Sequence, residues 1–142
     1  MATREELLAG LNEDLAAEFN AVITYRLFAS LCSGPYRQEI RAFFESEIPD
    51  ELGHAQFLAD KIVALGGTPT TEPGPVEITT DNRQMFEISL KAERDTIARY
   101  EKRIDQAEAV GETGLKIKLE DLIVDETQHA EEMERILHEW RS

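Results

Sequence analysis

The sequence of 142 residues has little cysteine and no long apolar run. The single cysteine, Cys32, excludes an internal disulfide and suits a reducing compartment, so we expect a cytoplasmic protein. No stretch approaches the ~20 apolar residues that a membrane-spanning helix needs. The first ten residues also lack the apolar centre of a secretion signal. We therefore expect no membrane partner.

Positive charge is scarce as well. There are 15 basic against 29 acidic residues, which gives a formal net charge of −14. Binding to nucleic-acid phosphates needs clustered Lys and Arg, and neither end of the chain has a Lys-rich tail, so we expect no nucleic-acid partner. We interpret most of the acidity as a solvated helix surface. Part of it could instead face a cavity that collects cations.

Glycine and proline are sparse, and they divide the chain at a few places. A break at Ser33-Gly34-Pro35, another at Gly66-Gly67 and a third at Gly111 separate long helical patterns. Residues 68–80 hold three prolines and form a connector too long for a tight hairpin. The pattern predicts one all-α domain spanning residues 1–142, a four-helix bundle made of two helical hairpins joined by a long crossover. The predicted helices run from about Arg4 to Cys32, Tyr36 to Leu65, Asp81 to just before Gly111, and Thr113 to Trp140.

Each predicted helix has apolar residues at steps of three and four, and each apolar stripe is interrupted by polar side chains. These polar residues must point into the bundle. A lone buried carboxylate is very costly, so each must be paired, protonated or bound to metal. The interrupting residues are Glu18 and Tyr25 in the first helix, Glu47, Glu51 and His54 in the second, Glu93 and Tyr100 in the third, and Glu126 and His129 in the fourth.

Except for Glu47, whose counterpart is Leu122, the interrupting residues repeat at one offset of 75 positions. In each half, a lone Glu precedes a Glu-x-x-His motif by 33 positions, which places both at a similar height in a helical hairpin. A buried salt-bridge network without metal is the alternative, and it is disfavoured because unpaired buried carboxylates are rarely tolerated. The pairs are Glu18 and Glu93, Tyr25 and Tyr100, Glu51 and Glu126, and His54 and His129.

This set of residue types is suited to a pair of metal ions. A Glu and a His three positions apart lie on one helix face, so both can reach one ion. Glu51 and Glu126 could bridge two ions, while Glu18 and Glu93 would bind at the outer sides. Four carboxylates and two neutral imidazoles carry a charge of −4, which balances two divalent cations. A thiol-free, carboxylate-rich set favours iron or manganese over structural zinc.

From about Leu11 to Trp140 the sequence resembles the bacterioferritin branch of the ferritin-like superfamily. The resemblance rests on residues 11–18 followed by Tyr25, and on the Asp50-Glu51-x-x-His54-Ala55 word. It implies a ferritin-like four-helix bundle with two iron ions per chain, which Mn or Zn could replace. It implies a ferroxidase that oxidises Fe(II) with dioxygen or hydrogen peroxide for iron storage or detoxification. The implied metal ligands are Glu18, Glu51, His54, Glu93, Glu126 and His129, and Tyr25 would lie beside the metals as a hydrogen-bond or one-electron donor.

Three positions depart from that family. Leu52 replaces the methionine that binds haem between bacterioferritin subunits, so we expect no haem. The sequence ends at Ser142, and we expect the family's short fifth helix to be missing. Ser46 replaces a histidine found on the inner surface of many relatives. We expect a homo-oligomer, but a 24-subunit shell, a smaller shell and a dimer all stay open.

Two other functions share this fold. A non-storing di-iron peroxidase or oxidase is one, although the sequence has no Cys-x-x-Cys pair for a rubredoxin-type electron donor. A Dps-like protective shell is the other, although Dps sites usually lie between subunits. Glu47 could lead iron in or out, or lie at the bundle edge. Asp50 and Asp125 could accept hydrogen bonds from the imidazoles or be merely exposed.

Overall fold

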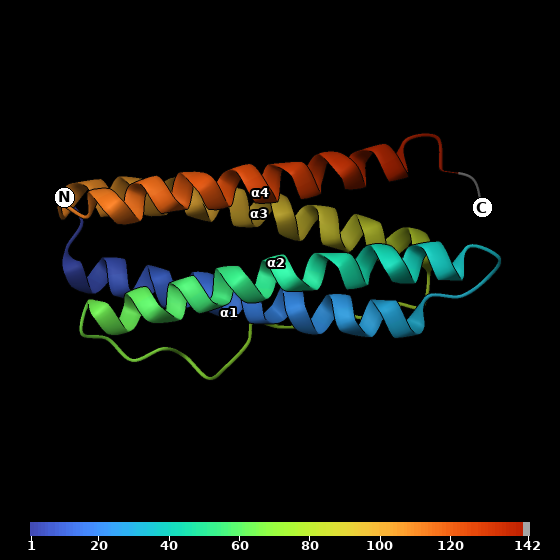
Figure 1. Cartoon of the computed structure of the whole chain (residues 1–142), viewed down its shortest axis with the longest axis horizontal. Coiled ribbons are helices and arrows are strands. Elements are labelled where there is room, and N and C mark those ends of the chain that lie inside the picture. Colours follow the sequence, from blue (N-terminus) through green and yellow to red (C-terminus); the bar gives the residue numbers. More distant parts are fainter. Residues whose placement is uncertain (141–142) are drawn as a thin grey trace.

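The computed structural model describes residues 1–140 and is a four-helix bundle (Figure 1). The part of the chain that the structure describes contains no β-strand, which confirms the predicted all-α class. Helices α1 and α2 form one hairpin and α3 and α4 the other, with the two hairpins side by side. The helices are α1 (Arg4–Leu31), α2 (Arg37–Ala64), α3 (Asn82–Ala109) and α4 (Thr113–Leu137).

The helix ends follow local side-chain chemistry. Thr3 caps α1 by accepting a hydrogen bond from the backbone N–H of Glu6, and Asp81 caps α3 by accepting one from Arg83. Gly66 and Gly111 follow α2 and α3 with φ angles of 88° and 79°. A residue with a side chain adopts this left-handed conformation at a cost, so glycine is favoured there and ends the helix.

The predicted end of the fourth helix at Trp140 is wrong. Helix α4 ends at Leu137, and His138 is already extended at φ −63° and ψ 121°. Glu139 then adopts a positive φ of 58°, which turns the chain back. This turn lets the Trp140 ring pack against Phe86, with the ring centroids 5.6 Å apart. No Gly or Pro marks this position in the sequence, and the end of the helix accompanies the contact between Trp140 and Phe86.

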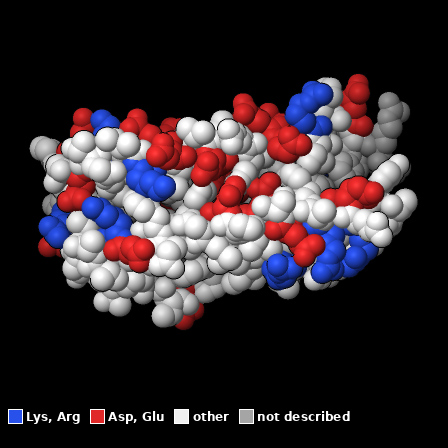
Figure 2. Space-filling view, viewed as in Figure 1, with Lys and Arg blue, Asp and Glu red and all other residues white. Residues whose placement is uncertain are grey.

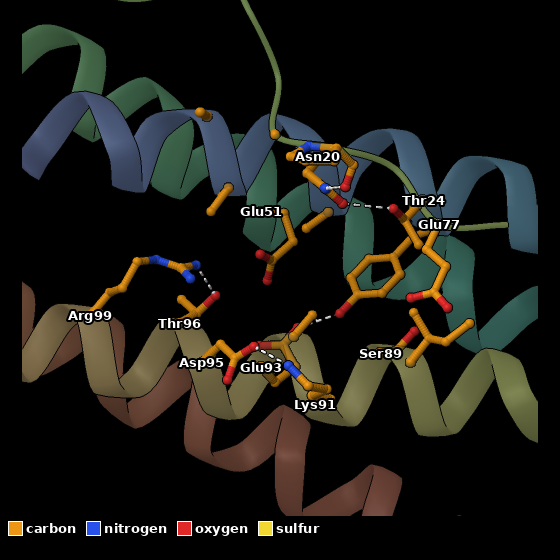
Figure 3. A pocket seen from close by; sticks show the side chains of 18 of the residues that line it. Asn20, Thr24, Glu51, Glu77, Ser89, Lys91, Glu93, Asp95, Thr96 and Arg99 are labelled. Carbon is orange, nitrogen blue, oxygen red and sulfur yellow. Dashed lines mark hydrogen bonds and ion pairs between the residues drawn. The ribbon is translucent and has the colours of Figure 1, made fainter.

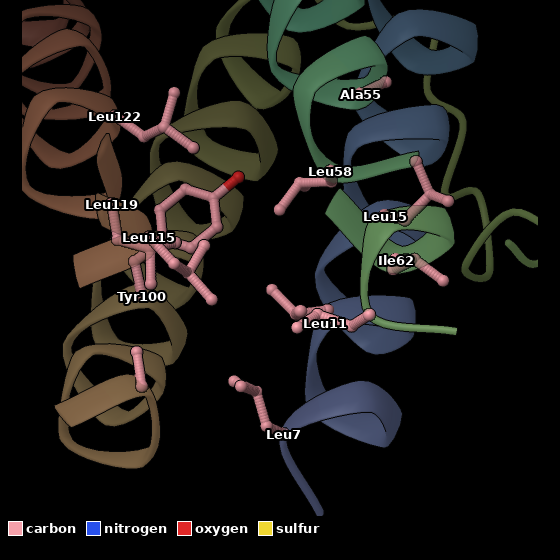
Figure 4. Packing of buried hydrophobic residues seen from close by; sticks show 12 residues of the cluster. Leu7, Leu11, Leu15, Ala55, Leu58, Ile62, Tyr100, Leu115, Leu119 and Leu122 are labelled. Atoms are coloured by element: carbon pink, nitrogen blue, oxygen red, sulfur yellow. The ribbon is translucent and has the colours of Figure 1, made fainter. Parts of the chain in front are cut away.

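Two apolar clusters fill the bundle, one on each side of its polar middle. The first is mainly aliphatic (Figure 4), and the second is rich in aromatic rings and methionine. Such burial is the main stabilising contribution to a bundle of this size. The first cluster includes Leu7, Leu11, Leu15, Leu58, Ile62, Leu115, Leu119 and Leu122, and the second includes Phe28, Phe44, Met85, Phe86 and Met133.

The connector between α2 and α3 crosses the length of the bundle against α1. Two asparagines of α1 hold it: Asn12 accepts a hydrogen bond from the backbone N–H of Thr70, and the side-chain amide of Asn20 donates to the carbonyl of Pro75. The N–H of Gly74 also donates to the Ala16 carbonyl at 2.9 Å. This crossover makes α2 and α3 run in the same direction (Figure 1).

Acidic groups lie across the middle of the face in Figure 2, and basic groups lie mostly toward its ends. None of the described helices is both long and apolar enough to span a bilayer.

Candidate metal centre

The six predicted ligands meet in the middle of the bundle. They form two groups of four, and within each group the candidate ligand atoms lie within 4.8 Å of one another. Glu51 and Glu126 belong to both groups. All six side chains are buried. The groups are Glu18, Glu51, His54 and Glu126, and Glu51, Glu93, Glu126 and His129.

Each imidazole points one nitrogen inward. His54 Nδ1 lies 2.8 Å from a Glu126 oxygen and 3.7 Å from a Glu18 oxygen. His129 Nδ1 lies 3.2 Å from a Glu51 oxygen and 3.8 Å from a Glu93 oxygen. The equivalent arrangement of the two histidines is what the repeat of 75 positions predicts.

The outer nitrogens contact aspartates on the opposite helix. His54 Nε2 of α2 lies 3.0 Å from Asp125 of α4, and His129 Nε2 of α4 lies 3.0 Å from Asp50 of α2. An aspartate that accepts a hydrogen bond from Nε2–H holds the tautomer in which Nδ1 keeps a lone pair for a metal. Of the two interpretations left open by the sequence, the structure supports the one in which both aspartates orient imidazoles.

Glu47 makes the site asymmetric. It is buried, and its carboxylate lies 2.9 Å from His129 Nε2, beside the Asp50 contact. Its counterpart in the repeat, Leu122, is a buried core residue. On its outer side, His129 therefore contacts two acidic residues, Glu47 and Asp50, whereas His54 contacts one, Asp125. Its contacts with Glu47 and Glu93 outweigh burial and raise the pKa of His129 to about 11.

Both repeat tyrosines donate hydrogen bonds to carboxylates of the candidate site across the bundle. Tyr25 of α1 donates to Glu93 of α3, and Tyr100 of α3 donates to Glu18 of α1. Burial, together with the neighbouring carboxylates, raises the pKa of each phenol well above 10. Both tyrosines are therefore protonated donors, each bonded to one carboxylate of the candidate site.

The inward atoms of the six residues lack hydrogen-bond partners among residues 1–140. The His54 and Glu126 atoms, for example, are close but poorly aligned for a hydrogen bond. Burial, followed by repulsion from Glu18, raises the pKa of Glu51 well above its usual range. Native proteins seldom leave buried polar atoms unpaired. The carboxylate and imidazole donors fit two divalent ions of the iron or manganese type.

The sequence reasoning missed a buried ion pair next to the site. Arg103 and Asp14 are 2% and 1% exposed, and Arg103 Nε lies 2.7 Å from an Asp14 oxygen. An Arg on a charged helix is usually at the surface. The available sequence signal was Gly10, a glycine inside a predicted helix; in the structure, an added Cβ there would overlap the Arg103 guanidinium.

Comparisons with known proteins agree with this architecture. The family model of the ferritin-like domain matches residues 8–142. The chain belongs to the ferritin-like family. Within it, a bacterioferritin of Mycobacterium bovis is 29% identical over 130 residues, which cover 91% of this chain and 82% of that protein. The bacterioferritin of Streptomyces coelicolor is 28% identical, covering 91% and 78%.

Solved structures of ferritin-like proteins superpose closely. A structure described as a ferritin-like, diiron-carboxylate protein from Bacillus anthracis is 53% identical, has a TM-score of 0.93, and covers 96% of this chain and 99% of its own. The Rhodobacter capsulatus bacterioferritin is 25% identical with a TM-score of 0.83, covering 97% and 87%. This ferritin-like chain is therefore of the bacterioferritin type, as its sequence predicts.

Proposed function

We propose that this ferritin-like protein binds two Fe(II) ions per chain and oxidises them with dioxygen or hydrogen peroxide. The carrying observation is the group of six buried ligand side chains whose inward atoms have no hydrogen-bond partner in the described chain. Their formal charge of −4 is matched by two divalent ions. The likeness to bacterioferritins and to a diiron-carboxylate protein supports iron as that metal.

The shared carboxylates, Glu51 and Glu126, would bridge the two ions. Glu18 and His54 would complete the ligands of one ion, and Glu93 and His129 those of the other. Two bound Fe(II) ions would supply two electrons as they become Fe(III); with two protons, these electrons reduce hydrogen peroxide to two waters, or dioxygen to hydrogen peroxide. Tyr25 keeps the Glu93 carboxylate in place through its hydrogen bond, and it is close enough to serve as a donor to the site.

The proposal is tested by adding Fe(II) to the metal-free protein without oxygen and then mixing with air or peroxide. We expect two irons bound per chain and a rapid ferric absorbance change. The Glu51→Gln/Glu126→Gln variant should lose both, because it removes both bridging charges. A matched variant, Glu131→Gln/Glu132→Gln on the exposed part of α4, should retain them. Failure of the wild type to bind two ions would overturn the proposal.

Iron storage in a homo-oligomeric cage and stand-alone di-iron chemistry both start from this site. The six ligands come from a single chain, unlike the interfacial sites of Dps-like shells. Light scattering before and after iron loading in air separates the two. A large particle that takes up many irons per chain indicates storage or detoxification, whereas a dimer that stops near two indicates a peroxidase or oxidase.

Haem binding stays a separate prediction. Leu52 is half-exposed on α2 and offers no sulfur ligand, so a haemin titration should give no methionine-ligated spectrum.

A further inference from the structure

The two repeat tyrosines have different surroundings. Tyr100 lies in a cluster whose other buried members are all aliphatic. Next to it, the Arg103 guanidinium forms two bonds to Asp14, of 2.7 and 3.1 Å, and lies against Gly10. These side chains are almost completely buried. Packed protein atoms therefore close this side of the site, which we call the closed side.

Tyr25 lies on the other side, which we call the open side. The residue 75 positions after Asp14 is Ser89, so the buried ion pair has no counterpart here. Instead, a cavity of about 420 Å³ lies between α1 and α3 (Figure 3). Tyr25, Glu51 and Glu93 line it, so the cavity reaches the candidate metal centre.

A continuous row of aromatic rings leads from Tyr25 through the interior. The Tyr25 ring stacks on Phe44 with the ring centroids 5.7 Å apart, and Phe44 stacks on Phe86 at 4.9 Å. Phe86 in turn packs against the Trp140 ring at 5.6 Å. The four rings come from α1, α2, α3 and the segment after α4, and we call them the aromatic row.

The outer end of the aromatic row lies at the surface. Trp140 is the only tryptophan in the sequence, and it is partly exposed after the end of α4. It lines a second cavity, of about 1080 Å³, at the end of the bundle. Three carboxylates and one guanidinium line this cavity, those of Glu39, Asp81, Glu139 and Arg83. The excess of negative charge favours a cation, such as hydrated Fe(II), beside the Trp140 ring.

The two ends of the aromatic row have the rings that are easiest to oxidise. Tyrosine and tryptophan lose one electron far more readily than phenylalanine does. An electron can therefore pass between Trp140 and Tyr25, because the packed rings of Phe44 and Phe86 fill the space between them. The Glu93 carboxylate, which accepts the Tyr25 hydrogen bond, can hold the phenolic proton while Tyr25 is oxidised.

We propose that the aromatic row is an electron-transfer path, and that Trp140 returns an electron to Tyr25 after Tyr25 has given one to the site. The inference rests on the proposed function and adds the surface residue through which electrons enter. Tyr100 also donates a hydrogen bond to a carboxylate of the site, that of Glu18. Its aliphatic surroundings give it no such path, so the two tyrosines differ in their redox role.

The electrons and protons balance for a site that holds a single Fe(II) when hydrogen peroxide arrives. Tyr25 supplies one electron beside the one from the Fe(II) substrate, and two solvent protons complete two waters. The phenolic proton moves to Glu93, which leaves a Tyr25 phenoxyl radical and Fe(III). Trp140 then gives one electron to Tyr25 and loses its indole proton to solvent, while Glu93 returns the phenolic proton. A second Fe(II), in solution, reduces the Trp140 radical to become Fe(III), and solvent restores the indole proton.

The path is tested on the metal-free full-length protein by pulse radiolysis with azide radicals, which oxidise tryptophan preferentially. All proteins carry Tyr36→Phe, because Tyr36 is 70% exposed and lines the same cavity as Trp140. We expect the indolyl absorption to decay as a phenoxyl absorption rises, at a rate independent of protein concentration. Tyr25→Phe should abolish this rise, whereas the matched Tyr100→Phe should keep it. A rise that survives Tyr25→Phe, or none in the parent protein, would overturn the path.

The contribution of the two phenylalanines is measured in the same way. Phe44→Leu/Phe86→Leu removes the rings between the ends, and we expect at least a tenfold slower transfer. The matched Phe19→Leu/Phe57→Leu variant, whose rings pack against the aliphatic cluster, should transfer at the parent rate. Phe86→Leu alone serves if the double variant does not fold, as judged by its melting curve. Equal rates in folded variants would overturn the proposed row.

The direction of electron flow is tested with less than one Fe(II) per chain, followed by hydrogen peroxide and then further Fe(II), with freeze-quench EPR. Trp140→Phe should make the tyrosyl signal persist at least tenfold longer than in the wild type. Equal lifetimes would show that a reductant reaches Tyr25 through the open-side cavity and would overturn the role of Trp140. Absence of a tyrosyl signal in both proteins would overturn it too. Failure of the wild type to bind Fe(II) would overturn the proposed function, whereas the radiolysis result needs no metal.

Discussion

Two regions of this bundle share a repeat but have different packing. Around Tyr100 and Glu18, a buried ion pair and aliphatic side chains fill the interior. Around Tyr25 and Glu93, aromatic rings fill the end of the bundle, and a cavity reaches the ligands. The comparison teaches that the repeat preserves the residues that face the site, while the residues one turn away decide which side is open.

Removing Arg103 should give the largest effect on the closed side. Arg103→Leu leaves the buried Asp14 carboxylate with only the more distant Arg99, at 3.7 Å, and breaking a buried pair in this way typically costs about 3–5 kcal/mol. Arg94→Leu is the matched control on α3, because the Arg94–Glu134 pair is exposed and such pairs contribute about 0–1 kcal/mol. Urea unfolding of the metal-free protein measures both. Equal losses would show that the buried pair does not stabilise the closed side.

Gly10→Ala tests the same packing from α1. The added Cβ would overlap the Arg103 guanidinium, so this side must rearrange, at an expected cost of about 1–3 kcal/mol. Gly114→Ala in α4 is the control, since nothing lies within 4 Å of its added Cβ. A Gly10→Ala protein as stable as the control would mean that Arg103 has room to move.

The pH dependence tests the asymmetry caused by Glu47. The pKa of His129 rises from 6.5 to about 11 on folding, so the folded state holds a proton that the unfolded state loses. This contribution is fully present below pH 6.5 and is lost as the pH rises toward 11. The pKa of His54 is also raised, in the same direction. For each of these two histidines, the free energy of unfolding of the metal-free protein should fall by up to about 1.4 kcal/mol per pH unit between pH 7 and 10.

Glu47→Leu should weaken that pH dependence, because it removes the carboxylate that lies 2.9 Å from His129 Nε2. Leucine is chosen because it is the residue at the equivalent position of the other half, Leu122. Melting temperatures at pH 7 and pH 10, without metal and with chelator present, measure the slope. An unchanged slope would mean that Glu47 does not contribute to the His129 proton. Metal binding should flatten the slope in the wild type, since the metal displaces the proton.

The smallest effect is expected on the open side. Ser89→Ala removes a buried hydroxyl that has no partner among the described residues, so the free energy of unfolding should change by less than about 0.5 kcal/mol. Asp14→Ala, at the equivalent position of the closed half, should cost several-fold more because it strands the Arg103 charge. Comparable costs, measured by urea unfolding, would remove the contrast between the two sides.

Much of the fold and the candidate site was predictable from local patterns. The interruption of each apolar stripe by Glu or His is visible in the sequence, and the 75-residue repeat relates the two hairpins. Helix ends at Gly66 and Gly111 were predictable because glycine tolerates positive φ. The end of α4 was not, because the contact between Trp140 and Phe86 that accompanies it joins residues distant in sequence.

The sequence by itself determined the four helices, the crossover and the set of candidate ligands, because periodicity and the cost of burying charge act on residue type and spacing. Only the tertiary structure decided that Asp50 and Asp125 contact imidazoles of the opposite helix. It also decided that one side of the site is closed by Arg103 while the other has a cavity. Those features depend on how side chains of facing helices, α2 with α4 and α1 with α3, fill the space between them, which residue spacing does not specify.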